Sequence, residues 1–160
     1  MIKFLSFVCL LVLVTPLTVS GQNRIVISKL KRELYVLNQY QDTLCVMRCG
    51  LGSNLGNKAR IGDRRTPEGV FAISNIHDSR TWTHDFKDGN GRIPGAYGPW
   101  FIRLAVPMFK GIGIHGTCFP NSIGTRCSEG CIRLHNKDIE KLIGYIKVGD
   151  KVEIKPDFIN

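Results

Sequence analysis

Apolar and polar residues alternate along most of this chain with the period of two that is typical of β-strands. The stretch 24–49, RIVISKLKRELYVLNQYQDTLCVMRC, contains three such runs, and NQYQD at 38–42 resembles a hairpin connection between the last two. The apolar positions that define these runs are Ile25, Ile27, Leu34, Val36, Leu44 and Val46. Further runs of strand character are VFAISNI, WFIRLAV, KGIGIHG and KVEIK. The pattern predicts a mostly β protein.

One segment near the C-terminus changes to a helical period. It is NKDIEKLIGYIK, residues 136–147, and its apolar residues at helical spacing are Ile139, Leu142, Ile143 and Ile146. Asn136 is expected to cap this helix at its start, and Gly149 marks its end. There is no internal repeat, so we expect a single-domain β-sandwich or closed sheet with one main α-helix near the C-terminus.

Two segments show neither period. Residues 50–69, GLGSNLGNKARIGDRRTPEG, are rich in glycine and asparagine, as loops are. Residues 77–99 form a long irregular stretch that contains Trp82 and His84. Loops of that length are often functional, so we expect this stretch to cover or line a site, although ordinary packing would also explain its aromatic residues.

The first 21 residues have the layout of a secretory signal peptide. Lys3 gives a basic start, an apolar run follows over 4–14, and small residues follow at Thr18, Ser20 and Gly21. The run is shorter than the ~20 apolar residues that a membrane-spanning helix needs. A buried core helix is the alternative interpretation. We expect an exported protein that works in the periplasm or cell envelope.

The chain is basic, with a formal net charge of +9. Removing the leader costs only Lys3, which leaves about +8 for the mature protein. Outside the cytoplasm nucleic acid is a poor partner, whereas a wall polymer that carries carboxylates or phosphates is a good one. Scattered lysines that only keep the protein soluble are the alternative. The sequence contains neither a glycine-rich phosphate loop nor a dinucleotide-binding fingerprint.

Five cysteines follow the leader, an odd number that suggests one thiol left free for chemistry. Cys45 and Cys49 cannot bridge each other within one extended strand, because four residues span roughly 13 Å. Cys118 and Cys127 flank a loop that contains a proline and a glycine, and a disulfide could close it. Cys45 and Cys49 would then be small buried hydrophobic residues or partners in more distant bridges. Cys131 is the candidate for a free thiol because of its position relative to a histidine.

The candidate chemistry lies in residues 113–134, GIHGTCFPNSIGTRCSEGCIRL. His115 ends one predicted strand and Cys131 begins another, so pairing of the two strands would let the imidazole activate the thiol. Arg133 lies two residues after Cys131 and should share its face, where a guanidinium suits a substrate carboxylate. Gly130 permits a sharp turn whose amide groups could form an oxyanion hole.

A zinc site is the competing interpretation of the same segment. Its ligands would be His115, Cys118, Cys127 and Cys131, whose spacing is loosely compatible with a tetrahedral site. Zinc ligation gives no reason for the glycines or for Arg133, so we favour nucleophilic catalysis.

The complete pattern resembles the L,D-transpeptidase catalytic domain (YkuD-type), a family that cross-links peptidoglycan. The family carries His-Gly-Thr and then Ser-x-Gly-Cys-x-Arg, which appear here at 115–117 and 128–133. RRTPEGVFAI upstream and VGDKVEI near the end resemble two further family motifs. The resemblance covers residues 24–155, which we take as the catalytic domain.

The resemblance implies a role for each matching residue. Cys131 would be the nucleophile, His115 its general base, and the Gly116 carbonyl would orient the imidazole. Arg133, Ser128 and Gly130 would form the substrate and oxyanion site. The implied reaction removes the terminal D-alanine of a stem tetrapeptide, leaves a thioester, and transfers the acyl group to the amine of a second stem peptide.

The resemblance also implies that no metal or organic cofactor takes part and that carbapenems acylate the enzyme; we expect a monomer. One departure is Glu129, because many members have histidine between the serine and the glycine. A carboxylate there could raise the pKa of the thiol, pair with Arg133 or hold the incoming amine. An L,D-carboxypeptidase of the same fold and a non-catalytic wall-binding module remain alternatives.

Overall fold

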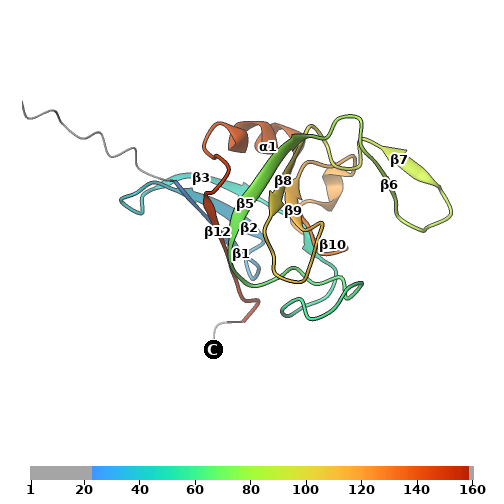
Figure 1. The fold of residues 1–160 in the computed structure, drawn as a ribbon, viewed down its shortest axis with the longest axis horizontal. Helices are drawn as coiled ribbons and strands as arrows, with labels where there is room; N and C mark the ends of the chain where they lie inside the picture. Colours follow the sequence, from blue (N-terminus) through green and yellow to red (C-terminus); the bar gives the residue numbers. More distant parts are fainter. Residues whose placement is uncertain (1–22, 159–160) are drawn as a thin grey trace, which may run out of the picture.

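The computed structural model describes residues 23–158, and one curled eight-stranded sheet dominates it. The strands of this sheet are β1 (Arg24–Ser28), β2 (Glu33–Leu37), β3 (Thr43–Arg48), β5 (Gly69–Asp78), β8 (Trp100–Leu104), β9 (Gly113–His115), β11 (Ile132–Arg133) and β12 (Lys151–Lys155). Their order across the sheet is β11-β9-β8-β5-β12-β1-β2-β3. The predicted mostly β domain is confirmed, with the strands curled around a single core (Figure 1).

Most neighbouring strands are antiparallel, and two pairs are parallel: β1 with β12 and β9 with β11. The curl brings the segment that follows β3 back to β11 at the other edge of the sheet. There Gly50 and Arg133 exchange two backbone hydrogen bonds, with N–O distances of 2.8 and 2.9 Å. The first third of the chain is thereby tied to the strand that carries the Cys-x-Arg motif.

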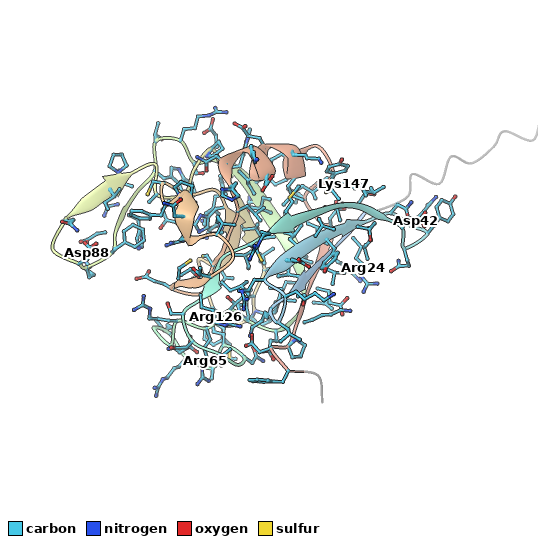
Figure 2. The ribbon with its side chains drawn as sticks, turned by 180° about the vertical axis from the view of Figure 1, so that it is seen from behind. Arg24, Asp42, Arg65, Asp88, Arg126 and Lys147 are labelled. Carbon is cyan, nitrogen blue, oxygen red and sulfur yellow. The ribbon has the colours of Figure 1, made fainter. Side chains whose placement is uncertain are left out.

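Two short strand pairs stand outside the main sheet. β4 (Leu51–Gly52) pairs with β10 (Arg126–Ser128), and β6 (Thr83–Asp85) pairs with β7 (Arg92–Pro94) as a hairpin. The hairpin projects from one end of the sheet, and Figure 2 shows Asp88 at its outer end. The irregular segment expected over 77–99 is therefore partly ordered as a β-hairpin. A short 3₁₀ helix, η1 (Pro120–Ser122), lies in the loop before β10.

The inner face of the sheet is apolar, as the alternating pattern predicts, but in β3 the face opposite to Leu44 and Val46 turns inward. In that strand Met47 is buried and Cys45 packs against the core, whereas Leu44 and Val46 are exposed. The alternation at Leu44 and Val46 therefore predicts the strand correctly but not the face that turns inward. Thr-Leu-Cys-Val-Met is apolar at adjacent positions, so a period of two does not fix which face turns inward.

The single helix of the described residues, α1 (Asn136–Ile143), is shorter than the predicted 136–147. His135 occupies the N-cap position, and the helix ends at Gly144, so Asn136 is not the cap and Gly149 is not the stop. Ile139 and Leu142 are buried against the sheet. The Asn136 side chain instead accepts a hydrogen bond from the Thr117 amide at 2.8 Å, which links the helix to the His-Gly-Thr motif.

A buried lysine, Lys29, connects the loop before β5 with the C-terminal segment. The side chain of Lys29 is fully buried, and its Nζ lies 2.6 Å from Glu68 Oε1 and 3.0 Å from Asp157 Oδ2. It also donates to the carbonyl oxygens of Gly56 and Thr66, at 2.7 and 3.2 Å. Lys29 therefore holds the 54–68 loop and the C-terminal segment against β1. Glu68 belongs to the Thr-Pro-Glu-Gly motif, which has a structural role here.

The predicted signal peptide, 1–21, lies outside the described residues. Within residues 23–158, no helix has both the length and the apolar character required to cross a bilayer.

Candidate active site

The parallel pair β9–β11 brings the predicted site residues together. Its register places Arg133 beside His115 and Ile132 beside Ile114. Side chains at paired positions leave the same face of a sheet. The two isoleucines are buried in the core, and His115 and Arg133 leave the opposite face. Cys131, just before β11, lines the same pocket on that face.

The pocket has a volume of about 820 Å³ and is bounded by segments far apart in the chain. The β6–β7 hairpin contributes His84 and Phe86, and the loops on the other side contribute Lys58 and Lys110. Lys58 Nζ lies 5.2 Å from the centroid of the Phe109 ring, so these two loops contact each other. A cleft of this size is sufficient for a peptide segment beside the thiol.

His115 is fixed as a neutral base. Its Nδ1 lies 2.6 Å from the carbonyl oxygen of Gly116, which can only accept, so Nδ1 carries the proton and Nε2 is left basic. The ring stacks on Phe101 with centroids 5.4 Å apart and meets the Tyr97 ring at 5.0 Å. Burial lowers the pKa of His115 to about 3, even though the bond to Gly116 acts in the opposite direction.

Close backbone packing explains the glycine after His115. A Cβ on Gly116 would lie 3.0 Å from Gly98 Cα and 3.0 Å from Pro99 Cδ, and it would also collide with Asn136. The carbonyl that orients the imidazole is therefore held by a site where only glycine fits.

Cys131 is half-buried, and its thiol donates to the carbonyl oxygen of Gly111 at 3.3 Å. Burial raises the pKa of this thiol above its ordinary value, and the charge of Arg133 lowers it while that of Glu129 raises it further. The pKa of Cys131 lies above its usual value and that of His115 lies below, so the resting pair is a neutral thiol and a neutral imidazole.

The turn before Cys131 is held by Ser128. Its hydroxyl donates to the Cys131 carbonyl oxygen at 2.6 Å and accepts from the Gly130 amide at 3.1 Å. Gly130 has a φ of 133°, and a Cβ there would lie 2.8 Å from the Arg65 carbonyl oxygen. Because the Gly130 amide is already bonded to Ser128, its role in an oxyanion site stays a prediction.

Arg133 is 7% exposed and presents a guanidinium beneath the hairpin. Its Cζ lies 5.5 Å from the centroid of the Phe86 ring, and Nη1 lies 4.0 Å from Cys127 Sγ. Buried Nε has no hydrogen-bond partner among the described residues. A buried guanidinium with an unused donor suits a ligand carboxylate.

The family profile of the L,D-transpeptidase catalytic domain, YkuD, matches residues 22–154. This chain belongs to the L,D-transpeptidase catalytic domain family. It is 40% identical over 92 residues to a putative L,D-transpeptidase of Bacillus licheniformis, an alignment that covers 58% of this chain and 46% of that protein. The chain spans about half the length of the curated relatives it matches.

Solved L,D-transpeptidases share the fold. L,D-transpeptidase 3 of Mycobacterium tuberculosis, with a faropenem-derived adduct, has a TM-score of 0.63 and 18% identity. The alignment covers 84% of this chain and 60% of that one. Another L,D-transpeptidase, in complex with imipenem, has a TM-score of 0.61 and 21% identity over 84% of this chain and 59% of that one.

All five cysteines of the described L,D-transpeptidase domain carry free thiols in the structure. The bridge between Cys118 and Cys127 stays a prediction. Across residues 23–158, no three or more side chains of histidine, cysteine, aspartate or glutamate form a group that could hold a metal ion. The zinc ligands considered from the sequence, His115, Cys118, Cys127 and Cys131, therefore do not converge.

Several pocket residues were not identified from the sequence. Tyr97 and Phe101 enclose His115, and Tyr97 Oη lies 2.8 Å from His84 Nδ1. His84 Nε2 lies 3.2 Å from Glu129 Oε2. The aromatic residues of the 77–99 segment were the available signal, although ordinary packing explained them equally well from the sequence; of these residues, Trp82 and His84 line the pocket.

The neutral resting pair predicts how Cys131 reacts with alkylating agents. We expect its rate of alkylation by iodoacetamide to keep rising with pH between about pH 6 and pH 9, because only the thiolate reacts. Peptide mass mapping would follow Cys131 separately from the half-buried Cys118. A preformed thiolate–imidazolium pair would instead give a plateau that extends below neutral pH, and such a plateau would contradict this interpretation.

Proposed function

We propose that this protein is an exported L,D-transpeptidase that uses Cys131 as nucleophile on peptidoglycan stem peptides. The observation that carries the proposal is the shared pocket of Cys131, His115 and Arg133, with His115 Nδ1 bonded to the Gly116 carbonyl. This arrangement supplies a nucleophile, a base in the required tautomer and a cation for a carboxylate. Membership of the L,D-transpeptidase catalytic domain family supports the proposal, as do relatives that are named L,D-transpeptidases.

In the first half-reaction, Arg133 binds the carboxylate of the terminal D-alanine of the donor. Cys131 gives its proton to His115 Nε2 as Sγ attacks the carbonyl carbon of the third stem residue. The bond from that carbon to the D-alanine nitrogen breaks, and His115 returns the proton to the departing amine. The donor is left as a thioester on Cys131.

In the second half-reaction, the side-chain amine of another stem peptide attacks the thioester carbon. A carbon–nitrogen bond forms, the carbon–sulfur bond breaks, and the thiolate of Cys131 leaves. The neutral His115 accepts the proton lost by the amine and passes it to the thiolate. Aromatic packing around His115 keeps it unprotonated at neutral pH, so it is ready to act as the base in both halves.

Export to the periplasm or cell envelope is part of the same proposal. The predicted leader supports it, and the net charge of about +8 that remains after removal of the leader would draw the protein to an anionic wall polymer.

Incubation of the purified protein with disaccharide tetrapeptide tests the proposal. We expect release of D-alanine and a cross-linked dimer, both detected by chromatography with mass spectrometry. Tripeptide without dimer would make the protein an L,D-carboxypeptidase, because water would then be the acceptor. No change in the tetrapeptide, from protein shown to be folded by circular dichroism, would favour the wall-binding alternative and contradict an enzymatic role.

A further inference from the structure

Most of the charged side chains that line the pocket are cationic. They are Arg64, Arg103, Lys110 and Arg133, together with Lys58, which is paired with Asp63 at 2.8 Å. The lining on the hairpin side includes His84 and Tyr97. Glu129 is the one acidic residue among the described residues that line the pocket. A cationic group of a substrate therefore has one acidic side chain to bind in this pocket.

Glu129 is held in a defined position on the hairpin side. Its carboxylate only accepts, so His84 Nε2 donates to it at 3.2 Å, and His84 Nδ1 then accepts from the Tyr97 hydroxyl at 2.8 Å. These bonds need no proton beyond that of neutral histidine. The side chain of Glu129 is nevertheless 53% exposed, so the carboxylate can bind a further partner from the pocket.

Glu129 and Cys131 line the same pocket. Glu129 lies two residues before Cys131, in the turn that Ser128 fixes through the Gly130 amide and the Cys131 carbonyl. The charge of Glu129 also raises the pKa of the Cys131 thiol. A group bound at Glu129 would consequently share the pocket with a thioester formed on Cys131.

We propose that Glu129, positioned by His84, binds the ammonium group of the acceptor. This inference rests on the proposed function and assigns one step of it. An alkylamine of a stem peptide is a cation at neutral pH, and the cationic side chains that line the pocket would repel it. Glu129 gives it one favourable place, whereas the carboxylates of the donor are drawn to the cationic groups.

The proton balance of the transfer step is complete without a further reactant. The bound ammonium first loses one proton to solvent and becomes a nucleophilic amine. The amine then attacks the thioester, and its second proton goes to His115 Nε2 as the carbon–nitrogen bond forms. The carbon–sulfur bond breaks, and His115 returns that proton to the Cys131 thiolate.

Glu129→Gln tests the assignment, since glutamine keeps the shape of the side chain but not its charge. The acylated enzyme would be given either a stem-peptide amine or hydroxylamine, a nucleophile that is mostly uncharged at neutral pH. We expect Glu129→Gln to lower transfer to the stem-peptide amine by about tenfold, mainly through a higher KM for that acceptor. Formation of the hydroxamate should change by less than about twofold.

Two further variants separate charge from shape. Glu129→Asp should recover part of the transfer, because it restores the carboxylate. Glu140→Gln, which removes an exposed carboxylate on α1 outside the pocket, should behave as the unaltered protein does. Equal losses with both nucleophiles would mean that Glu129 only shapes the turn, and no loss with either would mean that the ammonium binds elsewhere; each result would overturn the proposal.

Failure of the proposed function would look different. In that case the unaltered protein would not form the thioester at all, and neither nucleophile would yield a product. The comparison between nucleophiles is made only on enzyme whose acylation has been verified by intact mass, so the two failures are distinguishable.

Discussion

Replacement of Cys131 by alanine should abolish both peptide transfer and acylation by β-lactams. Without the sulfur no thioester can form, and we expect the rate to fall by at least about 10³-fold. Intact-mass analysis after imipenem treatment measures the effect directly, because the unaltered protein should gain one covalent adduct and Cys131→Ala none. The alanine side chain is smaller and fits the same half-buried position, so the fold should be retained.

Cys118→Ala is the matched control, since it removes another half-buried thiol of the same segment. It should keep the adduct and the transfer activity. An adduct that persists in Cys131→Ala, or a stable disulfide at Cys131 in active protein, would contradict the assignment of the nucleophile.

Replacement of Lys29 by methionine should lower the free energy of unfolding far more than replacement of an exposed lysine. Methionine fills a similar volume but leaves the carboxylates of Glu68 and Asp157 without the cation between them. Removing one partner from a buried ion pair typically costs about 3–5 kcal/mol, and we expect a loss in that range in the free energy of unfolding. Arg126 also pairs with Asp157 and would hold part of the cluster together.

Equilibrium urea denaturation of Lys29→Met and of Lys155→Met would measure this difference. Lys155 lies at the exposed end of β12, so its replacement should change the free energy of unfolding by less than about 0.5 kcal/mol. A loss of less than about 1 kcal/mol for Lys29→Met would show that the carboxylates find other partners.

The sequence predicted the strands well because one-sided burial imposes a period of two on them. The inward face of β3 could not be predicted, because Leu44, Cys45, Val46 and Met47 are all apolar. Alternation then does not show which of them point to the core. The sequence overextended the predicted helix because Ile146 packs against the core from beyond the helix end at Gly144. Apolar spacing records which residues are buried, and a buried residue in a loop can continue the pattern of the preceding helix.

For the candidate site, the sequence indicated Cys131, His115 and Arg133. They belong to two short motif segments, 115–117 and 128–133, and these segments adjoin strands that could be expected to pair. The partners of Glu129 could not be found in the same way. His84 is 45 positions away along the chain, in a segment whose hairpin is recognisable only from backbone pairing. Contacts between a loop and a distant hairpin leave no periodic trace in the sequence.

The backbone bridge between Gly50 and Arg133 has a consequence for how the enzyme acquires activity. It joins residues 83 positions apart. Closing so large a loop costs more chain entropy than forming a local hairpin, so the contact is expected to form more slowly. The guanidinium therefore reaches its final place only when the curled sheet has closed. We expect substrate binding through Arg133 to appear only after this long-range contact has formed, later than the local pairing of β6 with β7.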